Sequence, residues 1–477
     1  MDIKTEQFVQ VAEEELKNER TRLFLSLLPP AVSQRRQAAM STFSDPKAAM
    51  SYCASVRGAA VDNLPDLLEE FEKNATANGA KVIWARDAAE ANEFVVQKAR
   101  EKGVSYVTKG KSMVTEELGL NPVLEQNGIE AFETDLGEYI AQQLKRPPFH
   151  IVGPAINVPP EEIRDLFMDI GILEKATADP VELGLAARIY LRDKFHHLKM
   201  GITGINMAIA DTGSIINVEN EGNIRFTKAA PQTQISIMSI EKVIPSIKDA
   251  MFQVRLLCRS CTGQKISSYV TIDNGPKKND EIDGPEELYI VIVDNGRSAK
   301  YHDLLAREAL RCFRCGACLN ICPVYTTVGG YPYGWAYSGP MGQVLNPMLL
   351  GQERTQDLYR ASTLCGACKE VCPTGVNHPK IFRYYRSKDV DGDTEFGGKP
   401  RPLMESIIYK FWLQGVTNSW SWKLGARLAR PLLNNAIKNG WLRKKIKPLD
   451  NWLQARDLPL FPKKTFRDRW KDLRDRS

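Results

Sequence analysis

Between residues 65 and 295, short apolar runs alternate with longer segments in which apolar residues recur every three or four positions. The runs predict strands, and the periodic segments predict amphipathic helices. Strands are expected at 81–85, 105–108, 131–133, 150–152, 235–240 and 288–293, with two more around a turn at 211–213 inside 201–218. Helices are expected at 64–78, 87–102, 113–118, 140–144 and within 160–200. This alternation is typical of a parallel sheet covered by helices, so we predict one α/β domain over 65–295.

The rest of the chain has a helical pattern. A helix is expected over 13–28 and is predicted to end at Pro29 and Pro30. After residue 300 the strand patterns disappear, and helical segments alternate with clusters of Cys, Gly and Pro. We therefore expect a helical segment at 1–64, the α/β domain at 65–295, an all-helical module at 300–395 and a helical tail at 400–477.

The tail differs from the rest in charge. Residues 401–477 hold 18 Lys and Arg against 6 Asp and Glu, a balance of +12 in a chain whose net charge is +6. The tail also contains Trp412, Trp420, Trp422, Trp441, Trp452 and Trp470. Basic helices with Trp dock against proteins, lie on membrane surfaces or bind nucleic acid. A protein partner is favoured, a peripheral membrane contact comes second, and nucleic acid is not expected. The alternative is a solvated basic face over an internal Trp core.

The cysteines point to metal. No apolar run approaches the roughly 20 residues that span a bilayer, and the N-terminal sequence lacks the pattern of a signal peptide. The expected location is the cytoplasm, where structural disulfides are rare. Seven of the ten cysteines nevertheless lie between Cys312 and Cys372. Such clustering predicts a metal centre.

The first cysteine run has the spacing C-x2-C-x2-C-x3-C-P. Its cysteines are Cys312, Cys315, Cys318 and Cys322. Two-residue gaps allow three thiolates to converge on one cube of iron and sulfide, and small Gly316 and Ala317 let backbone N–H groups approach the sulfides. In two-cluster proteins the fourth cysteine of such a run binds the other cluster. Structural zinc is the alternative, but zinc sites usually join two separate CxxC or CxxH pairs.

The second run repeats the end of the first. Cys365, Cys368 and Cys372 match its last three cysteines, and Ser362 stands where the first would be. Crossed ligation then predicts a first cluster on Cys312, Cys315, Cys318 and Cys372, and a second on Cys322, Cys365 and Cys368. The second cluster lacks a fourth thiolate. It is either a three-iron cluster or a four-iron cluster with another ligand, such as the Ser362 oxygen or water.

These motifs together resemble the lactate utilization protein B family, whose members are iron–sulfur subunits of a three-part L-lactate oxidation system. Residues 210–213 (ADTG) and 218–223 (VENEGN) are similar to its LUD (lactate utilization) domain, and the two cysteine runs to its helical ferredoxin module. The resemblance implies that all seven cysteines bind two iron–sulfur clusters, both expected to be 4Fe-4S. It also implies a cysteine-rich partner subunit and a second LUD-type subunit.

The predicted function is electron transfer from L-lactate, which becomes pyruvate, to an acceptor that the sequence does not identify. Whether this chain is itself an enzyme is left open. In the alternative, the LUD domain binds substrate or cofactor and is catalytic, with the clusters as its electron outlet. A third interpretation is an assembly scaffold with structural clusters.

Two further patterns in the α/β region each have a simpler explanation. Residues 108–112 (TKGKS) follow a strand and precede a helix, so they predict either an anion site or an ordinary turn with Ser112 as the helix N-cap. The carboxylates of Asp211, Glu219 and Glu221 lie in predicted turns, where they either face a pocket or are solvated.

The remaining thiols and imidazoles are weaker candidates. Cys258 and Cys261 form a CxxC pair, which predicts a redox pair, a ligand pair (including the missing ligand of the second cluster) or two half-buried thiols near a turn. The pair His196 and His197 ends a predicted helix, where packing or surface roles are favoured over metal. Cys53 stands alone in an Ala-rich helical segment and is expected to be a small buried side chain.

Overall fold

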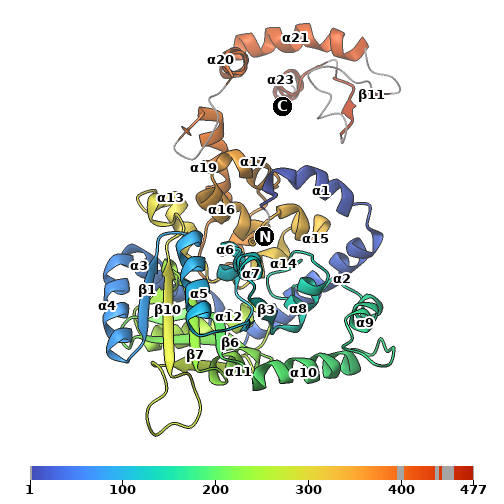
Figure 1. Ribbon diagram of the computed structural model, residues 1–477. Coiled ribbons are helices and arrows are strands. Elements are labelled where there is room, and N and C mark those ends of the chain that lie inside the picture. Colours follow the sequence, from blue (N-terminus) through green and yellow to red (C-terminus); the bar gives the residue numbers. More distant parts are fainter. Residues whose placement is uncertain (1–2, 395–401, 436–439, 443–455, 463, 476–477) are drawn as a thin grey trace. The chain divides into compact units, whose positions relative to one another are not determined.

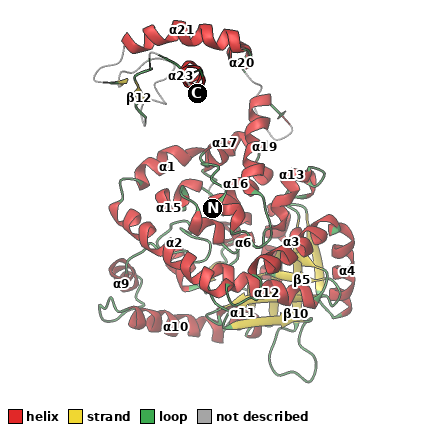
Figure 2. Cartoon of the chain, turned by 180° about the vertical axis from the view of Figure 1, so that it is seen from behind, coloured by secondary structure: helices red, strands yellow, loops and turns green. Residues whose placement is uncertain are grey.

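The computed structural model describes residues 3–394, 402–435, 440–442, 456–462 and 464–475. The chain divides into two compact units, Met1–Lys399 and Pro400–Ser477. Figure 2 shows the strands of the first unit gathered in one region, with helices making up the rest of it. None of the helices in the described ranges is both long enough and apolar enough to cross a membrane.

The first unit contains a six-stranded parallel sheet with the strand order β1-β10-β7-β4-β2-β3. The strands are β1 (Lys81–Ala85), β2 (Tyr106–Lys109), β3 (Glu130–Glu133), β4 (Met200–Gly204), β7 (Thr233–Ser239) and β10 (Glu287–Val293). The α/β prediction for this region is confirmed. Every residue of the central strand β7 is buried, as expected for a parallel sheet with both faces covered.

The two faces of this sheet pack against different elements. Helices α5 (Ala88–Glu101), α6 (Met113–Leu118) and α7 (Leu120–Gln126) bury one face, where Ile235 and Ile237 of β7 lie. Helix α4 (Leu64–Ala77) and a second sheet cover the other face. Alternating side chains of β7 therefore pack into two different hydrophobic cores. Figure 1 shows α4 and α5 beside β1 and β10.

The second sheet was not predicted. It has four strands in the order β8-β5-β6-β9, namely β5 (Met207–Ile209), β6 (Ser214–Glu219), β8 (Val243–Ile244) and β9 (Tyr269–Asp273). The expected turn at 211–213 joins β5 and β6, but 201–218 forms three strands instead of two. The chain changes sheets at Ile205 and Asn206, whose N–H groups donate to Ile237 of the first sheet and Ile216 of the second. A continuous apolar pattern does not show such a change of partner.

Helices make up most of the remaining first unit. Before and within the sheet region these are α1 (Phe8–Glu15), α2 (Glu19–Met40), α3 (Pro46–Asp62), α8 (Leu136–Gln143), α9 (Pro160–Asp169), α10 (Pro180–His196), α11 (Asn223–Ala229) and α12 (Ile247–Cys261). The cysteine region contains α13 (Leu304–Arg307), α14 (Ala317–Ile321), α15 (Tyr325–Val328), α16 (Gly339–Leu350), α17 (Gln352–Arg360), α18 (Ala367–Glu370) and α19 (His378–Asp391). Short 3-10 helices include η1 (Thr5–Gln7), η2 (Ile240–Lys242), η3 (Ser298–Lys300), η4 (Glu308–Arg311) and η5 (Tyr331–Tyr333).

Two further local predictions are wrong. Helix α2 continues through Pro29 and Pro30 to Met40 instead of ending at residue 28. Its packing against α12, α14 and α15, with Pro29 buried, outweighs a cost of about 3 kcal/mol for a proline inside a helix. Residues 150–152 form bends and not a strand, because the ring nitrogen Nδ1 of His150 accepts the N–H groups of Val152 and Gly153.

The second unit contains helices α20 (Leu403–Thr417), α21 (Ser419–Asn435) and α23 (Phe466–Arg474), with a strand pair β11 (Trp441–Leu442) and β12 (Leu458–Pro459). Its described tryptophans are between 44% and 71% exposed, and they are Trp412, Trp420, Trp422, Trp441 and Trp470. Trp452 lies outside the described residues. The described part of the tail therefore does not form an internal Trp core. Its exposed indole rings are available for contacts with a partner or a membrane surface.

A buried chain of charges joins the sheet to the first cysteine run. Arg297, just after β10, donates two parallel hydrogen bonds to Glu117 on α6, at 2.7 and 2.8 Å. The Nε atom of Arg297 lies 2.8 Å from the carboxylate of Glu241, which also pairs with the guanidinium of Arg314. Tyr337 donates its hydroxyl to Glu117 at 2.5 Å. The side chains of both glutamates and of Arg297 are fully buried.

Each charge in this network depends on its neighbours. Burial alone raises the pKa of Glu241, but Arg297 and Arg314 hold that pKa far below its usual range, so the carboxylate stays ionised. A buried ion whose partner is removed costs several kcal/mol, whereas an exposed pair contributes about 1 kcal/mol or less. The network therefore fixes the first cysteine run against the carboxyl end of β7.

Glu241→Gln is expected to lower the free energy of unfolding by about 3–5 kcal/mol, because the buried guanidinium of Arg314 loses its counter-charge and that of Arg297 keeps only Glu117. Chemical denaturation at neutral pH measures the change. The matched control is Asp62→Asn, which removes a half-exposed partner of Arg307 and is expected to change stability by less than about 1 kcal/mol. Equal effects of the two substitutions would contradict the role of the network.

Candidate functional site

The seven clustered thiols fall into two adjoining groups. Burial raises the pKa of Cys318 well above its usual value, and the thiols that add most to this rise are Cys315, Cys312 and Cys372. Burial likewise raises the pKa of Cys368, followed by the effects of Cys322 and Cys365. Cys368 is also the next neighbour of Cys318, so the two groups lie side by side. The structure thus brings together the first set, Cys312, Cys315, Cys318 and Cys372, and the second set, Cys322, Cys365 and Cys368.

The two cysteine runs share a backbone conformation. In each Cys-Gly-Ala-Cys core the glycine is left-handed, with φ of 76° at Gly316 and 88° at Gly366, and a short helix follows it. The residue before the core is also left-handed although it has a side chain, with φ of 62° at Arg314 and 58° at Leu364. Such residues are uncommon. Their recurrence at equivalent positions shows that the runs are a structural duplicate.

Ser362 takes the place of Cys312 in this duplicate. The N–H of Arg314 points at the sulfur of Cys312, 3.3 Å away, and the N–H of Leu364 donates to the hydroxyl of Ser362 at 3.2 Å. Each contact joins a side chain to the amide two residues later. The hydroxyl oxygen of Ser362 therefore lies where the first sulfur of a complete run would lie.

The spacing of the thiols suits a cluster better than a single ion. Sulfur ligands around one tetrahedral zinc lie about 3.8 Å apart, given a Zn–S bond of about 2.3 Å. Among the described residues, no three cysteine sulfurs all lie within 4.8 Å of one another. Backbone amides also point at the sulfurs, as when Val376 N–H lies 3.3 Å from Cys372. Hydrogen bonds to sulfur are one means by which proteins tune iron–sulfur clusters, so the residues present fit such a group.

Cations surround the first thiol group. Arg36 is near Cys315 and Cys372, whereas Arg57, Lys242 and Arg314 are near Cys312. Burial, then Arg314, lowers the pKa of Lys242 to about 7. An iron–sulfur cube held by thiolates carries net negative charge, and nearby positive charge stabilises it. The sequence analysis missed this set, since the four residues come from separate segments.

A cavity of about 310 Å³ lies beside this group, at the carboxyl ends of the central strands. It is lined by Ser112 after β2, Gly204 and Asn206 at the end of β4, and Ser239 at the end of β7. The chain leaves β2 for β3 on one side, but proceeds from β4 through β7 to β10 on the other. The crevice between β2 and β4 is therefore a topological switch point, where open α/β sheets bind ligands.

Close packing shapes the floor of this cavity. A Cβ atom added at Gly204 would lie 2.4 Å from the hydroxyl oxygen of Ser112. Only glycine lets the start of α6 approach β4 so closely. As expected, Ser112 caps α6, with its oxygen 3.4 Å from the N–H of Thr115.

The opposite wall comes from the cysteine region and α12. Phe313 and Arg314 of the first run line the cavity, together with Cys258 and Cys261. Burial raises the pKa of Cys261 to about 11, and this thiol is a neighbour of Cys315. The structure therefore places Cys261 beside the first group, whereas the missing ligand is in the second.

The loop carboxylates have separate roles. Glu219 and Glu221 line the cavity, whereas Asp211 is exposed and does not. Glu219 accepts the N–H groups of Ile224 and Arg225 at the start of α11, at 2.7 and 3.0 Å. Burial, then Asp135, raises the pKa of Glu221 to about 7.

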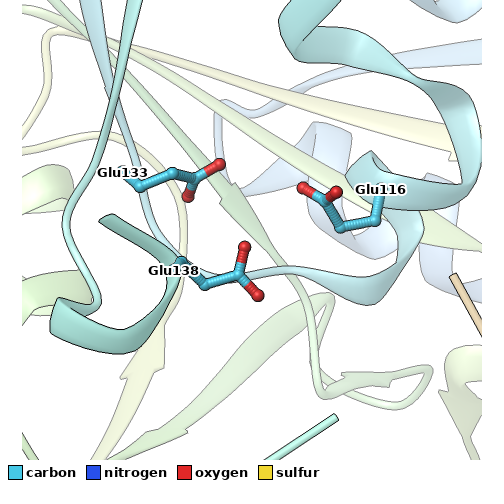
Figure 3. Close-up of side chains that lie close together, drawn as sticks. All are labelled: Glu116, Glu133 and Glu138. Carbon is cyan, nitrogen blue, oxygen red and sulfur yellow. The ribbon is translucent and has the colours of Figure 1, made fainter. Parts of the chain in front are cut away.

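The lysines of 108–112, considered either as an anion site or as part of an ordinary turn, already have partners. Lys109 is buried, and its amino group lies 3.0 Å from Glu116 and 2.7 Å from Glu133. Figure 3 shows the carboxylates of Glu116, Glu133 and Glu138 facing one another. Burial, then the other two carboxylates, raises the pKa of Glu138 well above its usual value. Lys109 supplies the positive charge that this cluster needs, and no metal is required to explain it.

The two adjacent histidines and the isolated cysteine have the surface and core positions that the sequence favours for them. His196 and His197 are exposed at the end of α10. Cys53 is fully buried in the core on α3, and burial raises the pKa of its thiol to about 12.

Comparisons with known proteins divide the chain in the same way. A family model described as the LUD domain matches residues 68–293. A 4Fe-4S dicluster domain matches 308–376, and the C-terminal region of lactate utilisation protein B matches 387–474. A solved structure of a DUF162 family protein from Deinococcus radiodurans is 13% identical and covers 48% of this chain and 98% of that one, with a TM-score of 0.27. That score is too low to inform the fold.

Several curated relatives match nearly the whole chain. Lactate utilization protein B of Bacillus velezensis is 39% identical over 476 residues, covering 99% of this chain and 98% of the relative. The protein of that name from Macrococcus caseolyticus is 39% identical over 472 residues, covering 98% and 97%. The one from Anoxybacillus flavithermus is 41% identical over 417 residues, covering 87% and 86%. With its α/β LUD domain, its 4Fe-4S dicluster domain and this similarity, the chain belongs to the lactate utilization protein B family of iron–sulfur proteins.

Proposed function

We propose that the chain is an iron–sulfur electron-transfer subunit of a complex that oxidises L-lactate to pyruvate. The first cluster is held by Cys312, Cys315, Cys318 and Cys372, and the second by Cys322, Cys365 and Cys368. The observation that carries this proposal is the arrangement of seven thiols in two adjoining groups. When bound, the clusters supply one-electron transfer over a short distance.

One of the seven thiols is exposed to solvent. Cys315 and Cys318 of the first group are buried, whereas Cys365 of the second is exposed. An external redox partner can therefore approach the second group. We infer that partners include a cysteine-rich subunit and a second LUD-type subunit of the lactate oxidation system, in the cytoplasm. The exposed, basic, Trp-containing helices of the tail support docking to a partner or a peripheral membrane contact.

Ser362 completes the ligand set of the second cluster in this proposal. Its hydroxyl oxygen occupies the position that Cys312 has in the first run, and its contact to the following amide is the same in kind. A four-iron cluster with three thiolates and one serine oxygen follows from this match. In a three-iron or a water-ligated cluster, the equivalence of Ser362 and Cys312 would have no function.

Anaerobically purified full-length protein is expected to contain about eight iron and eight sulfide per chain, as two four-iron clusters require. Cys318→Ala is expected to remove about half of the iron, because it takes a ligand from the first group alone. The control Cys53→Ala is expected to retain all of it. Iron and sulfide analysis with electron paramagnetic resonance measures both. A colourless, iron-free protein would overturn the proposal.

The lactate assignment has its own test. The chain is combined with its partner subunits, and L-lactate is added under anaerobic conditions. Reduction of both clusters, followed by electron paramagnetic resonance, is the expected result, with D-lactate as a comparison. Clusters that dithionite reduces but L-lactate does not would leave the iron–sulfur assignment standing and remove the lactate one.

Ser362→Cys is expected to raise the reduction potential of the second cluster, because a hard oxygen ligand stabilises oxidised iron more than a thiolate does. Ser362→Ala is expected to convert this cluster to a three-iron form on exposure to air. Redox titration and electron paramagnetic resonance follow the two changes. The matched control is Ser387→Ala on α19. Spectra and potentials that do not change in either Ser362 variant would show that another group binds the fourth iron.

A further inference from the structure

The cavity at the switch point lies between the sheet and the first thiol group, and its occupant is not assigned. We propose that it binds a small organic carboxylate, with the amino group of Lys242 as the cationic partner of the anion. Its volume of about 310 Å³ is at the lower end of the range for small-molecule sites. The position at the carboxyl ends of β2, β4 and β7 is the one at which such sheets bind ligands.

Lys242 is a half-buried lysine whose amino group faces the cavity side of the first thiol group. It is the last residue of η2 and lines the cavity. Within the described part of the chain, no hydrogen bond or ion pair reaches its amino group. Its charged neighbours include Arg314 and Arg57, which add to the positive potential, while Glu241 is already shared by two guanidinium groups. Together these cations make the wall beside Lys242 positive, and a carboxylate in the cavity would be attracted to it.

A second orphaned group points to a polar ligand. Ser239 ends β7 and lines the cavity, and its side chain is fully buried. Its hydroxyl has no hydrogen-bond partner among the described residues. Buried hydroxyls normally have a partner in the protein or in ordered water. A carboxylate oxygen beside Lys242 would accept a hydrogen bond from this hydroxyl.

No ion pair joins Lys242 to the three acidic residues of the wall, of which Glu221 accepts the N–H of Leu136 at 3.5 Å. Both carboxylate oxygens of Glu219 accept amides of α11, and Asp135 caps α8 by accepting the N–H of Glu138 at 3.0 Å. Asp135 also lies 3.7 Å from Lys111. These carboxylates are therefore occupied by partners in the α/β domain, and the charged groups close to Lys242 include the cations Arg314 and Arg57.

The mixed lining favours an organic anion over an inorganic one. Phe313, Val218 and Met113 contribute apolar surface to the same cavity as Lys242. Inorganic phosphate would gain nothing from contact with such surface, but the carbon atoms of a hydroxy or keto acid would be buried by it. This inference rests on the proposed function for the identity of the carboxylate, since the donor of the proposed complex is a 2-hydroxy acid and its product a 2-oxo acid.

The test is calorimetric titration of the anaerobically purified full-length protein with pyruvate, L-lactate and inorganic phosphate. Saturable binding of the two carboxylates, with phosphate much weaker, is the expected result. Lys242→Met is expected to weaken carboxylate binding about tenfold or more, as the loss of a charge-assisted contact does. The matched control Lys73→Met, at an exposed position of α4, is expected to bind normally.

Folding and cluster content are checked in each variant by thermal unfolding and iron analysis. Lys242→Met replaces a half-buried side chain that makes no hydrogen bond or ion pair among the described residues, so it is expected to fold. Lys242→Gln provides a second, polar variant with the same expected loss of binding. Absence of carboxylate binding to the wild-type chain, tighter binding of phosphate, or unchanged binding in both Lys242 variants would each overturn the inference.

The outcomes separate this inference from the proposed function. Clusters reduced by L-lactate in the assembled complex, with no carboxylate bound by this chain, would place the donor site on another subunit. Carboxylate binding that depends on Lys242, with clusters that L-lactate does not reduce in the complex, would support the cavity and reject the lactate pathway.

Discussion

The carboxylate of Glu241, just after the central strand β7, joins the end of β10 to the first cysteine run. It pairs with Arg297, which follows β10, and with Arg314, which lies inside the first cysteine run. Because all three groups are buried, none can move away without leaving a charge uncompensated. The left-handed backbone at Arg314 is held in the same way, since its guanidinium also donates to the carbonyl of Cys312 at 2.6 Å. The position of the first thiol group relative to the sheet thus follows from one buried anion.

The two thiol groups have different surroundings. The first has the cations Arg36, Arg57, Lys242 and Arg314 as neighbours. In the second group, the pKa values of Cys368 and Cys322 are affected, apart from burial, by other thiols and by backbone amides. Cys365 of this group is exposed. Positive charge stabilises a reduced cluster, which is the more negative state. In the proposed centre the first cluster is therefore tuned by buried charge and the second by amides, solvent and the oxygen of Ser362.

The sequence predicts the parts of this molecule that depend on local pattern. The apolar runs locate β1, β2, β3, β7 and β10, and cysteine spacing locates both thiol groups and the substitution at Ser362. Prediction fails where a distant partner decides the outcome. Helix α2 passes through Pro29 because other helices pack on it, and the chain changes sheets after Ile205 because Ile216 of the second sheet accepts the amide of Asn206. The cavity could not be predicted for the same reason, since Ser239 and Lys242 acquire their role only when β2, β4 and β7 lie side by side.

The short helix η2 connects the first cysteine run to the cavity. Its residue Glu241 holds the first cysteine run, and the next residue, Lys242, faces the cavity. An anion bound beside Lys242 and an electron added to the first cluster would both place negative charge in the same low-dielectric region, where like charges repel strongly. Such coupling is reciprocal: reduction of the cluster weakens anion binding by the factor by which the anion disfavours reduction. A carboxylate in this cavity would therefore be held less tightly when the first cluster is reduced, whichever subunit supplies the electron.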